Sequence, residues 1–185
     1  MDTFSIDVKP RKFKVAWIEN TLTWDYEEYL AQGESWSDNM TPGDGARILA
    51  FEAVLELQRD VLLPPDNFTL SLNIVDDGYR KTARTAAGNI TRNESTNAEL
   101  NASNLNPRGQ EGLYEADSAE ELLQYLMSEP GAKFGQGEWI WTVVAQDADP
   151  DSIIPGTIDP DGGNDWTLEI RIRVLVPELT EVAEE

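Results

Sequence analysis

Residues 166–176, with the sequence WTLEIRIRVLV, show the most regular pattern in the chain. Large apolar side chains occupy every second position from Trp166 to Val176, and threonine, glutamate and arginine fill the positions between them up to Arg173. A strict apolar–polar alternation predicts a β-strand that buries one face and exposes the other. This segment therefore predicts a sheet with one buried face. The rest of the chain must supply the neighbouring strands and the elements that cover that face.

Three further segments predict strands. Residues 67–74 repeat the alternation, with Phe, Leu and Ile at every second position. Residues 138–146 are apolar on both faces, which predicts a central strand or a strand covered by a partner. Residues 3–18 alternate in two short runs, so they predict two short strands or one strand broken at Pro10.

Helix signals lie between these strands. Residues 45–60 follow Pro42-Gly43-Asp44, in which Asp44 is a suitable N-cap, and their apolar side chains fall on two faces of a helical wheel. Such a helix is expected to lie between two layers, one of them the sheet and the other this chain or a neighbouring copy. Shorter helices are predicted at residues 23–32 and at residues 118–128, where Ser118 and Glu121 form a capping box.

The sum predicts an α+β fold. We expect a largely antiparallel sheet of about five strands, with two to three helices on one face. Residues 1–177 form a single domain in this interpretation, and residues 178–185 form an acidic tail. A long polar loop at residues 76–117 is either an arm that orders on a neighbouring subunit or a surface loop.

The charge of the chain is its strongest compositional signal. It has 35 acidic and 14 basic residues, a net charge of -21, and neither histidine nor cysteine. That self-repulsion opposes a compact fold in dilute buffer and is screened in molar salt, where the Debye length falls to about 3 Å. The composition therefore predicts a salty solvent. It excludes histidine-based catalysis and thiolate zinc sites, and it makes nucleic-acid binding improbable.

An aspartate-rich segment at residues 147–165 is the best candidate for a metal site. Alternate carboxylates on a turning loop can converge on a hard cation such as Ca²⁺. The EF-hand pattern fails, because Ser152 stands at the turn glycine and Ile158 at the twelfth position. The alternative is an acidic turn between two strands. The candidate ligands are Asp147, Asp149, Asp151, Asp159, Asp161 and Asp165.

Other functional signals are missing from the sequence. No apolar run is long enough to span a membrane, and the N-terminus lacks a secretory signal, so we expect synthesis in the cytoplasm. No phosphate-binding glycine loop, nucleophile elbow or dinucleotide fingerprint occurs. These observations predict a protein that is not an enzyme and uses no cofactor, with Ca²⁺ as the alternative.

The acidic excess, the few lysines and the absence of cysteine resemble proteins of salt-loving archaea and their viruses. Small cysteine-free α+β domains with a long arm also resemble the tail, neck and head-completion proteins of tailed viruses. Residues 45–62, 76–117 and 139–144 are the segments that fit this resemblance. It implies a structural subunit of a virion that contacts copies of itself and other structural proteins. The expected contact residues are Ile48, Phe51, Leu55, Arg80, Lys81, Arg84, Trp139 and Trp141.

Overall fold

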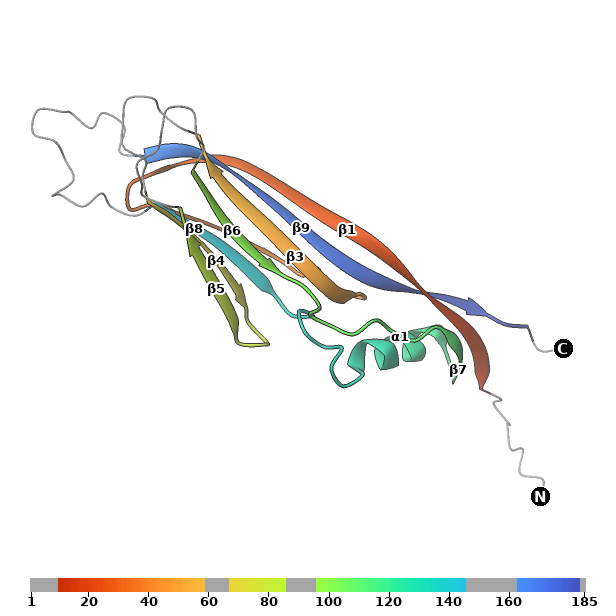
Figure 1. Cartoon of the computed structure of the whole chain (residues 1–185). Helices are drawn as coiled ribbons and strands as arrows, with labels where there is room; N and C mark the ends of the chain where they lie inside the picture. Colours follow the sequence, from red (N-terminus) through yellow and green to blue (C-terminus); the bar gives the residue numbers. More distant parts are fainter. Residues whose placement is uncertain (1–9, 59–66, 86–95, 146–162, 184–185) are drawn as a thin grey trace, which may run out of the picture.

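The computed structural model describes residues 10–58, 67–85, 96–145 and 163–183. The described strands form two antiparallel sheets that pack face to face around a common core (Figure 1). The five-stranded sheet has the order β6-β3-β9-β1-β7, and the four-stranded sheet has the order β2-β8-β4-β5. The elements are β1 (Arg11–Ala31), β2 (Ser35–Met40), β3 (Arg47–Leu57), β4 (Phe68–Ile74), β5 (Tyr79–Arg84), β6 (Thr96–Ala102), β7 (Gly112–Ala116), α1 (Ala119–Ser128), β8 (Trp139–Ala145) and β9 (Gly163–Glu181).

The expected α+β fold is wrong, because the described residues are mostly strand and contain one short helix, α1. The strands predicted at residues 67–74, 138–146 and 166–176 are confirmed as β4, β8 and β9. The helix predicted at residues 118–128 is confirmed as α1, and the Ser118 side chain accepts a hydrogen bond from the Glu121 amide at 3.1 Å. The error lies in the segments between them.

The helix predicted at residues 45–60 is strand β3. A register shift between Ile48 and Ala50 places an irregularity near the start of the strand, so Ile48 and Phe51 both reach the core although they are three positions apart. That spacing imitates one turn of a helix. Beyond the irregularity Phe51, Ala53 and Leu55 alternate inward with period two, and pairing with β9 and β6 overrides the helix propensity of alanine, glutamate and leucine.

The helix predicted at residues 23–32 is the second half of β1, which begins directly after Pro10. Leu22, Trp24 and Tyr26 alternate toward the core, so the acidic residues between them belong to an exposed strand face rather than to the first turn of a helix. The polar loop expected at residues 76–117 contains β5, β6 and β7. The first residues of the expected acidic tail lie in β9, which extends to Glu181.

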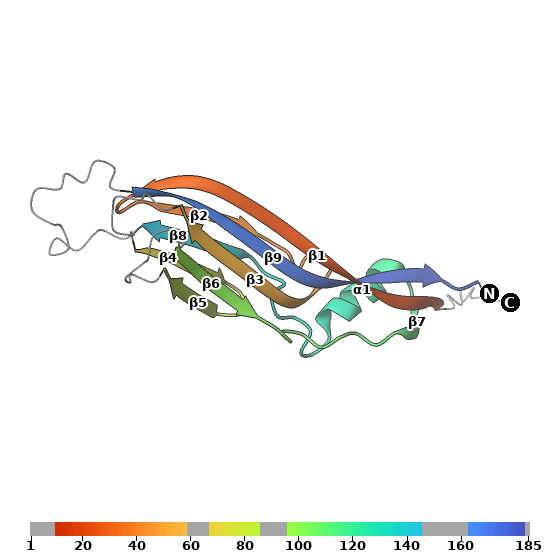
Figure 2. The ribbon, with the colours of Figure 1, turned by 45° about the horizontal axis from the view of Figure 1, so that its top comes forward.

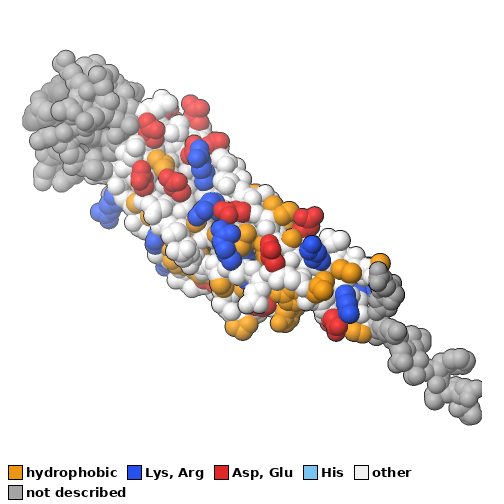
Figure 3. All heavy atoms as spheres, turned by 45° about the vertical axis from the view of Figure 1, so that its right-hand side comes forward, with side chains coloured by type: hydrophobic (Ala, Val, Ile, Leu, Met, Phe, Trp, Pro, Cys, Tyr) orange, Lys and Arg blue, Asp and Glu red, His pale blue; other side chains and the backbone are white. Residues whose placement is uncertain are grey.

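The pairing of β1 with β9 forms a ladder that runs the length of the molecule. It is continuous from Phe13 opposite Glu181 to Ala31 opposite Gly163. Figures 1 and 2 show that the ladder projects beyond the two sheets, where β7 and α1 join it. The molecule is therefore elongated. On the surface view in Figure 3, charged side chains of both signs follow its length, and more of the hydrophobic ones lie toward the projecting end.

The ladder supports two cores on its opposite faces. Leu22 and Trp24 of β1 pack against the main core between the two sheets, together with apolar and aromatic side chains from seven other strands. Phe13 and Val15 instead pack against Leu122 of α1 and its neighbours. Because side chains of an unbroken strand alternate between faces, the odd-numbered and even-numbered residues must face opposite ways. The helix thus has a small core of its own.

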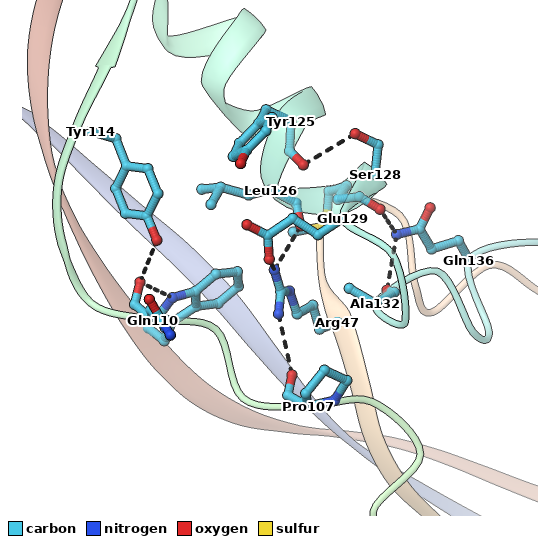
Figure 4. Close-up of polar contacts among 12 residues, drawn as sticks. Arg47, Pro107, Gln110, Tyr114, Tyr125, Leu126, Ser128, Glu129, Ala132 and Gln136 are labelled. Atoms are coloured by element: carbon cyan, nitrogen blue, oxygen red, sulfur yellow. Dashed lines mark hydrogen bonds and ion pairs between the residues drawn. The ribbon is translucent and has the colours of Figure 1, made fainter.

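Arg47 connects the helix to the main body (Figure 4). Its side chain, at the start of β3, is buried, and one terminal nitrogen donates to the Leu126 carbonyl at 2.9 Å and to a Glu129 carboxylate oxygen at 2.8 Å. The other terminal nitrogen donates to the Pro107 carbonyl at 3.3 Å, and the guanidinium lies 4.6 Å from the centre of the Trp17 ring. A cation at the C-terminal end of a helix also stabilises the helix dipole.

Replacing Arg47 with methionine is expected to lower the free energy of unfolding by about 3 kcal/mol, because buried acceptors then lose a charged donor. Urea unfolding in molar KCl, followed by tryptophan fluorescence, measures the loss. Arg108→Met is the matched control, since Arg108 also pairs with a glutamate, Glu19, at 3.1 Å but on the surface. We expect the control to change stability by less than about 1 kcal/mol. Equal effects of the two substitutions would contradict the assigned role of Arg47.

Candidate functional site

Open depressions lie on the described surface. One lies between β3, β9 and the segment after β6, and it is lined by Glu52, Asn101, Arg171 and Arg173 among others. Of the described residues that line it, Glu52 is the only carboxylate. A second depression beside it is lined by Asn104, Asn106 and Arg108 and their neighbours. The linings of these two depressions hold no pair of carboxylates, the arrangement that acid–base catalysis without histidine needs. A third depression holds two, Asp38 and Glu138, which accept hydrogen bonds from Tyr26 and Asn39 respectively.

The structure places five of the expected contact residues in the main core. Ile48, Phe51, Leu55, Trp139 and Trp141 have exposed fractions of 0–3%. The Phe51 ring meets the rings of Trp139 and Trp141 edge to face, with centroids 5.5 and 6.0 Å away. The second apolar face that suggested a neighbouring copy is therefore covered by the four-stranded sheet of the same chain.

The three expected basic contact residues lie together on β5, an edge strand of the four-stranded sheet. Arg80 and Arg84 are exposed on the outer face of that sheet. Lys81 points the other way, donates to the Asn101 carbonyl at 3.1 Å and lies 5.7 Å from the centre of the Tyr79 ring. Lys81 thus bridges the edges of the two sheets, whereas the two arginines are available to a partner.

Most of the expected calcium ligands, Asp147, Asp149, Asp151, Asp159 and Asp161, lie outside the described residues. Asp165 is exposed near the start of β9, opposite Tyr29 of β1. Within the described ranges no group of three acidic side chains is placed to hold a metal ion. The calcium hypothesis therefore stays a prediction from the sequence.

On the outer face of the four-stranded sheet the outward-pointing strand positions carry no carboxylate, whereas Asp38 of β2, which accepts a hydrogen bond from Tyr26, and Glu138 line a depression at its margin. Cross-strand neighbours form rows such as Ser37, Thr142, Ser71 and Thr82, whose hydroxyls meet in pairs at 3.5 and 3.4 Å. We call this surface the hydroxyl face. Its members are Ser35, Ser37, Asn39, Thr69, Ser71, Asn73, Arg80, Thr82, Arg84, Ile140, Thr142 and Val144.

Two side chains at the centre of the hydroxyl face are apolar. Ile140 and Val144 of β8 are half-buried, and no described helix or strand packs over them from outside (Figure 2). Glu138, directly before β8, marks the border of the face and accepts a hydrogen bond from the Asn39 amide at 2.7 Å. In a chain with 35 acidic residues, a flat sheet face without carboxylates is a distinct feature.

The outer face of the five-stranded sheet has the opposite character. Strands β6, β3, β9 and β1 all expose carboxylates on this face. Glu169 and Asp25 are direct cross-strand neighbours, and Val54 of β3 separates Glu169 from Glu99. Arg171 and Arg173 of β9 offset part of this charge, and Arg171 pairs with Glu169 at 2.6 Å. We call this surface the acidic face. Its charged members include Glu19, Asp25, Glu27, Glu52, Glu56, Glu99, Asp165, Glu169, Arg171 and Arg173.

The projecting end carries three exposed apolar side chains. Leu113 of β7, Ile18 of β1 and Val182 after β9 are 67%, 44% and 40% exposed. Lys12 and Lys14 lie on the same face of β1, because side chains two positions apart share a face. Leu113 pairs directly with Lys14. Isolated exposed apolar residues are common on protein surfaces, so this end is a weaker candidate than the two sheet faces.

A tyrosine joins the two sheets at their other margin. The Tyr26 hydroxyl of β1 donates to a carboxylate oxygen of Asp38 in β2 at 2.6 Å, and its ring meets Trp36 edge to face at 4.6 Å. Burial, and then the hydrogen bond to the carboxylate, raise the pKa of Tyr26 well above its usual value. Burial, followed by the nearby Glu129 carboxylate, also raises the pKa of Tyr114.

Comparison with known proteins adds no identification. No protein-family model matches the chain, and no curated protein matches it. Among the described residues, no helix is both long and apolar enough to cross a membrane.

The sequence contained a signal for the hydroxyl face that our prediction did not use. In residues 67–74 and 139–145 the positions between the buried ones are serine, threonine, asparagine or β-branched apolar residues, never acidic ones. In residues 166–173 and 51–57, glutamate occurs at such positions. Comparing exposed positions strand by strand would have separated a neutral face from an acidic face.

Replacing Tyr26 with phenylalanine is expected to cost about 1 kcal/mol at neutral pH, because Asp38 loses its donor. The raised pKa means that the neutral phenol stabilises the fold fully below pH 10 and loses this effect as pH rises further. The stability gap between the native protein and the variant should therefore shrink above pH 10. Urea midpoints measured from pH 7 to pH 11 test this, with exposed Tyr125→Phe as the control. A gap that stays constant would contradict the assignment.

Proposed function

We propose that this protein is a non-enzymatic structural subunit that assembles with copies of itself and with other structural proteins, in the virion of a halophilic tailed virus. The observation that carries the assembly role is the hydroxyl face, a sheet surface whose outward-pointing strand positions hold no carboxylate, on a chain of net charge -21. Its exposed hydroxyl, amide and β-branched side chains suit contact with another protein surface.

Electrostatics explains why this face matters. Two copies of a chain with net charge -21 repel each other, and each carboxylate brought to a contact must also lose water. A face without carboxylates avoids the cost of removing water from charged groups. Molar salt removes most of the repulsion between copies, because it shortens the screening length to about 3 Å. The same composition therefore favours assembly in concentrated salt and dissociation in dilute buffer.

The packing of the chain indicates which surfaces an assembly would use. Its aromatic and aliphatic side chains close a core within one protomer, so the subunit has no need of a partner to cover its tryptophans. Assembly would then use surfaces of a folded protomer, as in many symmetric complexes. The virion setting rests on the acidic, cysteine-free composition alone, because residues 45–62 and 76–117, which carried the resemblance to tailed-virus proteins, contain strands rather than a helix and a long arm.

Light scattering after size exclusion tests the proposal. In molar KCl we expect a discrete oligomer whose population rises with protein concentration, and after transfer to dilute buffer we expect a smaller species. Circular dichroism in both solutions separates dissociation from unfolding. A folded monomer at every salt and protein concentration would contradict self-assembly.

A further inference from the structure

We infer that the hydroxyl face of one copy docks on the acidic face of the next copy, front to back. This inference rests on the proposed function and names the two surfaces that carry it out. The two faces lie on the outer sides of the same sandwich, so each protomer offers one of each. A contact between unlike faces is heterologous, and repeated contacts of this kind build rings or filaments.

Charge complementarity selects this pairing. Arg80 and Arg84 are the charged side chains of the hydroxyl face, and the acidic face carries Glu52, Glu56 and Asp25 among its exposed carboxylates. In molar salt only charges in direct contact still attract one another, so matched surfaces are required. Two acidic faces would bring carboxylates together. Two hydroxyl faces would leave Arg80 and Arg84 of both copies without acidic partners.

The hydroxyl face is also chemically suited to a carboxylate-rich surface. Its hydroxyl and amide groups can donate hydrogen bonds to carboxylates, while Ile140 and Val144 at the centre lose water on contact. A donor to a charged acceptor contributes more than a neutral pair does. Because Arg80 and Arg84 lie on the edge strand β5, they would reach the rim of the contact, where charges fix its register.

The size of the face predicts a reversible contact. Four strands about 4.8 Å apart and six residues at about 3.4 Å each span roughly 19 by 20 Å, or about 400 Å² in projection. A stable interface buries about 800 Å² on each partner. A single contact is therefore expected to be weak, and closure of a ring or growth of a filament would add the remaining stability.

Two double variants test the pairing. Arg80→Glu with Arg84→Glu disables the hydroxyl face, and Glu52→Lys with Glu56→Lys disables the acidic face. All four side chains are exposed, so both variants should keep the native circular dichroism spectrum and urea midpoint. Each variant alone is expected to be monomeric in molar KCl. An equimolar mixture should recover the oligomer, because one contact of each pair is native and the other joins the glutamates introduced on one variant to the lysines introduced on the other.

Lys12→Glu with Lys14→Glu is the matched control for the hydroxyl-face variant, because it makes the same change in net charge on exposed residues of the projecting end. This control should keep the oligomer of the native protein. If the hydroxyl-face variant is monomeric while the acidic-face variant still dimerises, the inference is overturned, and two hydroxyl faces must contact each other instead. Variants that both retain the native oligomer would overturn it while leaving the proposed function intact. If the native protein is monomeric at every salt and protein concentration, both the proposed function and this inference are contradicted.

Discussion

The antiparallel pairing of β1 with β9 is the constraint on which the rest of the structure depends. It is the longest pairing in the described chain, and it joins the first described strand to the last. One face of the ladder closes the main core against the four-stranded sheet, and the other face receives α1. The outer positions of β9 and β1 also carry part of the acidic face. Packing, shape and surface charge therefore all depend on the register of β1 against β9. A shift by one residue would turn the apolar side chains of about twenty residues to the wrong face, so the alternation fixes this register.

Arg47 shows how a chain poor in cations places one of them. A buried ion pair is weak evidence for stability, since removing two charges from water offsets most of their attraction. Its value here is positional. The guanidinium contacts the end of α1, the segment before β7 and the Trp17 ring, so it fixes the helix relative to three other elements. An apolar side chain could fill the space, but it could not satisfy the carbonyls of Leu126 and Pro107.

The sequence predicted those elements whose pattern is local and uninterrupted. The alternation of residues 67–74, 138–146 and 166–176 and the capping box at Ser118 were sufficient for three strands and the helix. Residues 45–60 misled the prediction because an irregular step between Ile48 and Ala50 changes the phase of the apolar side chains. The two outer faces could not be predicted as surfaces, since each gathers residues from four strands whose order depends on pairing across long sequence separations. That order also decided that Phe51 and Trp139 belong to the core.

The order of strands in the five-stranded sheet has a consequence for how the protein forms. Strand β9 lies between β3 and β1, and every other described strand precedes it in the chain. Until β9 is synthesised, the β3–β6 and β1–β7 pairs cannot join, and each has an open edge beside apolar side chains. Late closure of such distant contacts slows folding and exposes edges to aggregation. The negative charge that opposes association of folded protomers in dilute buffer would then also oppose aggregation of incomplete chains, whose strand edges are still open.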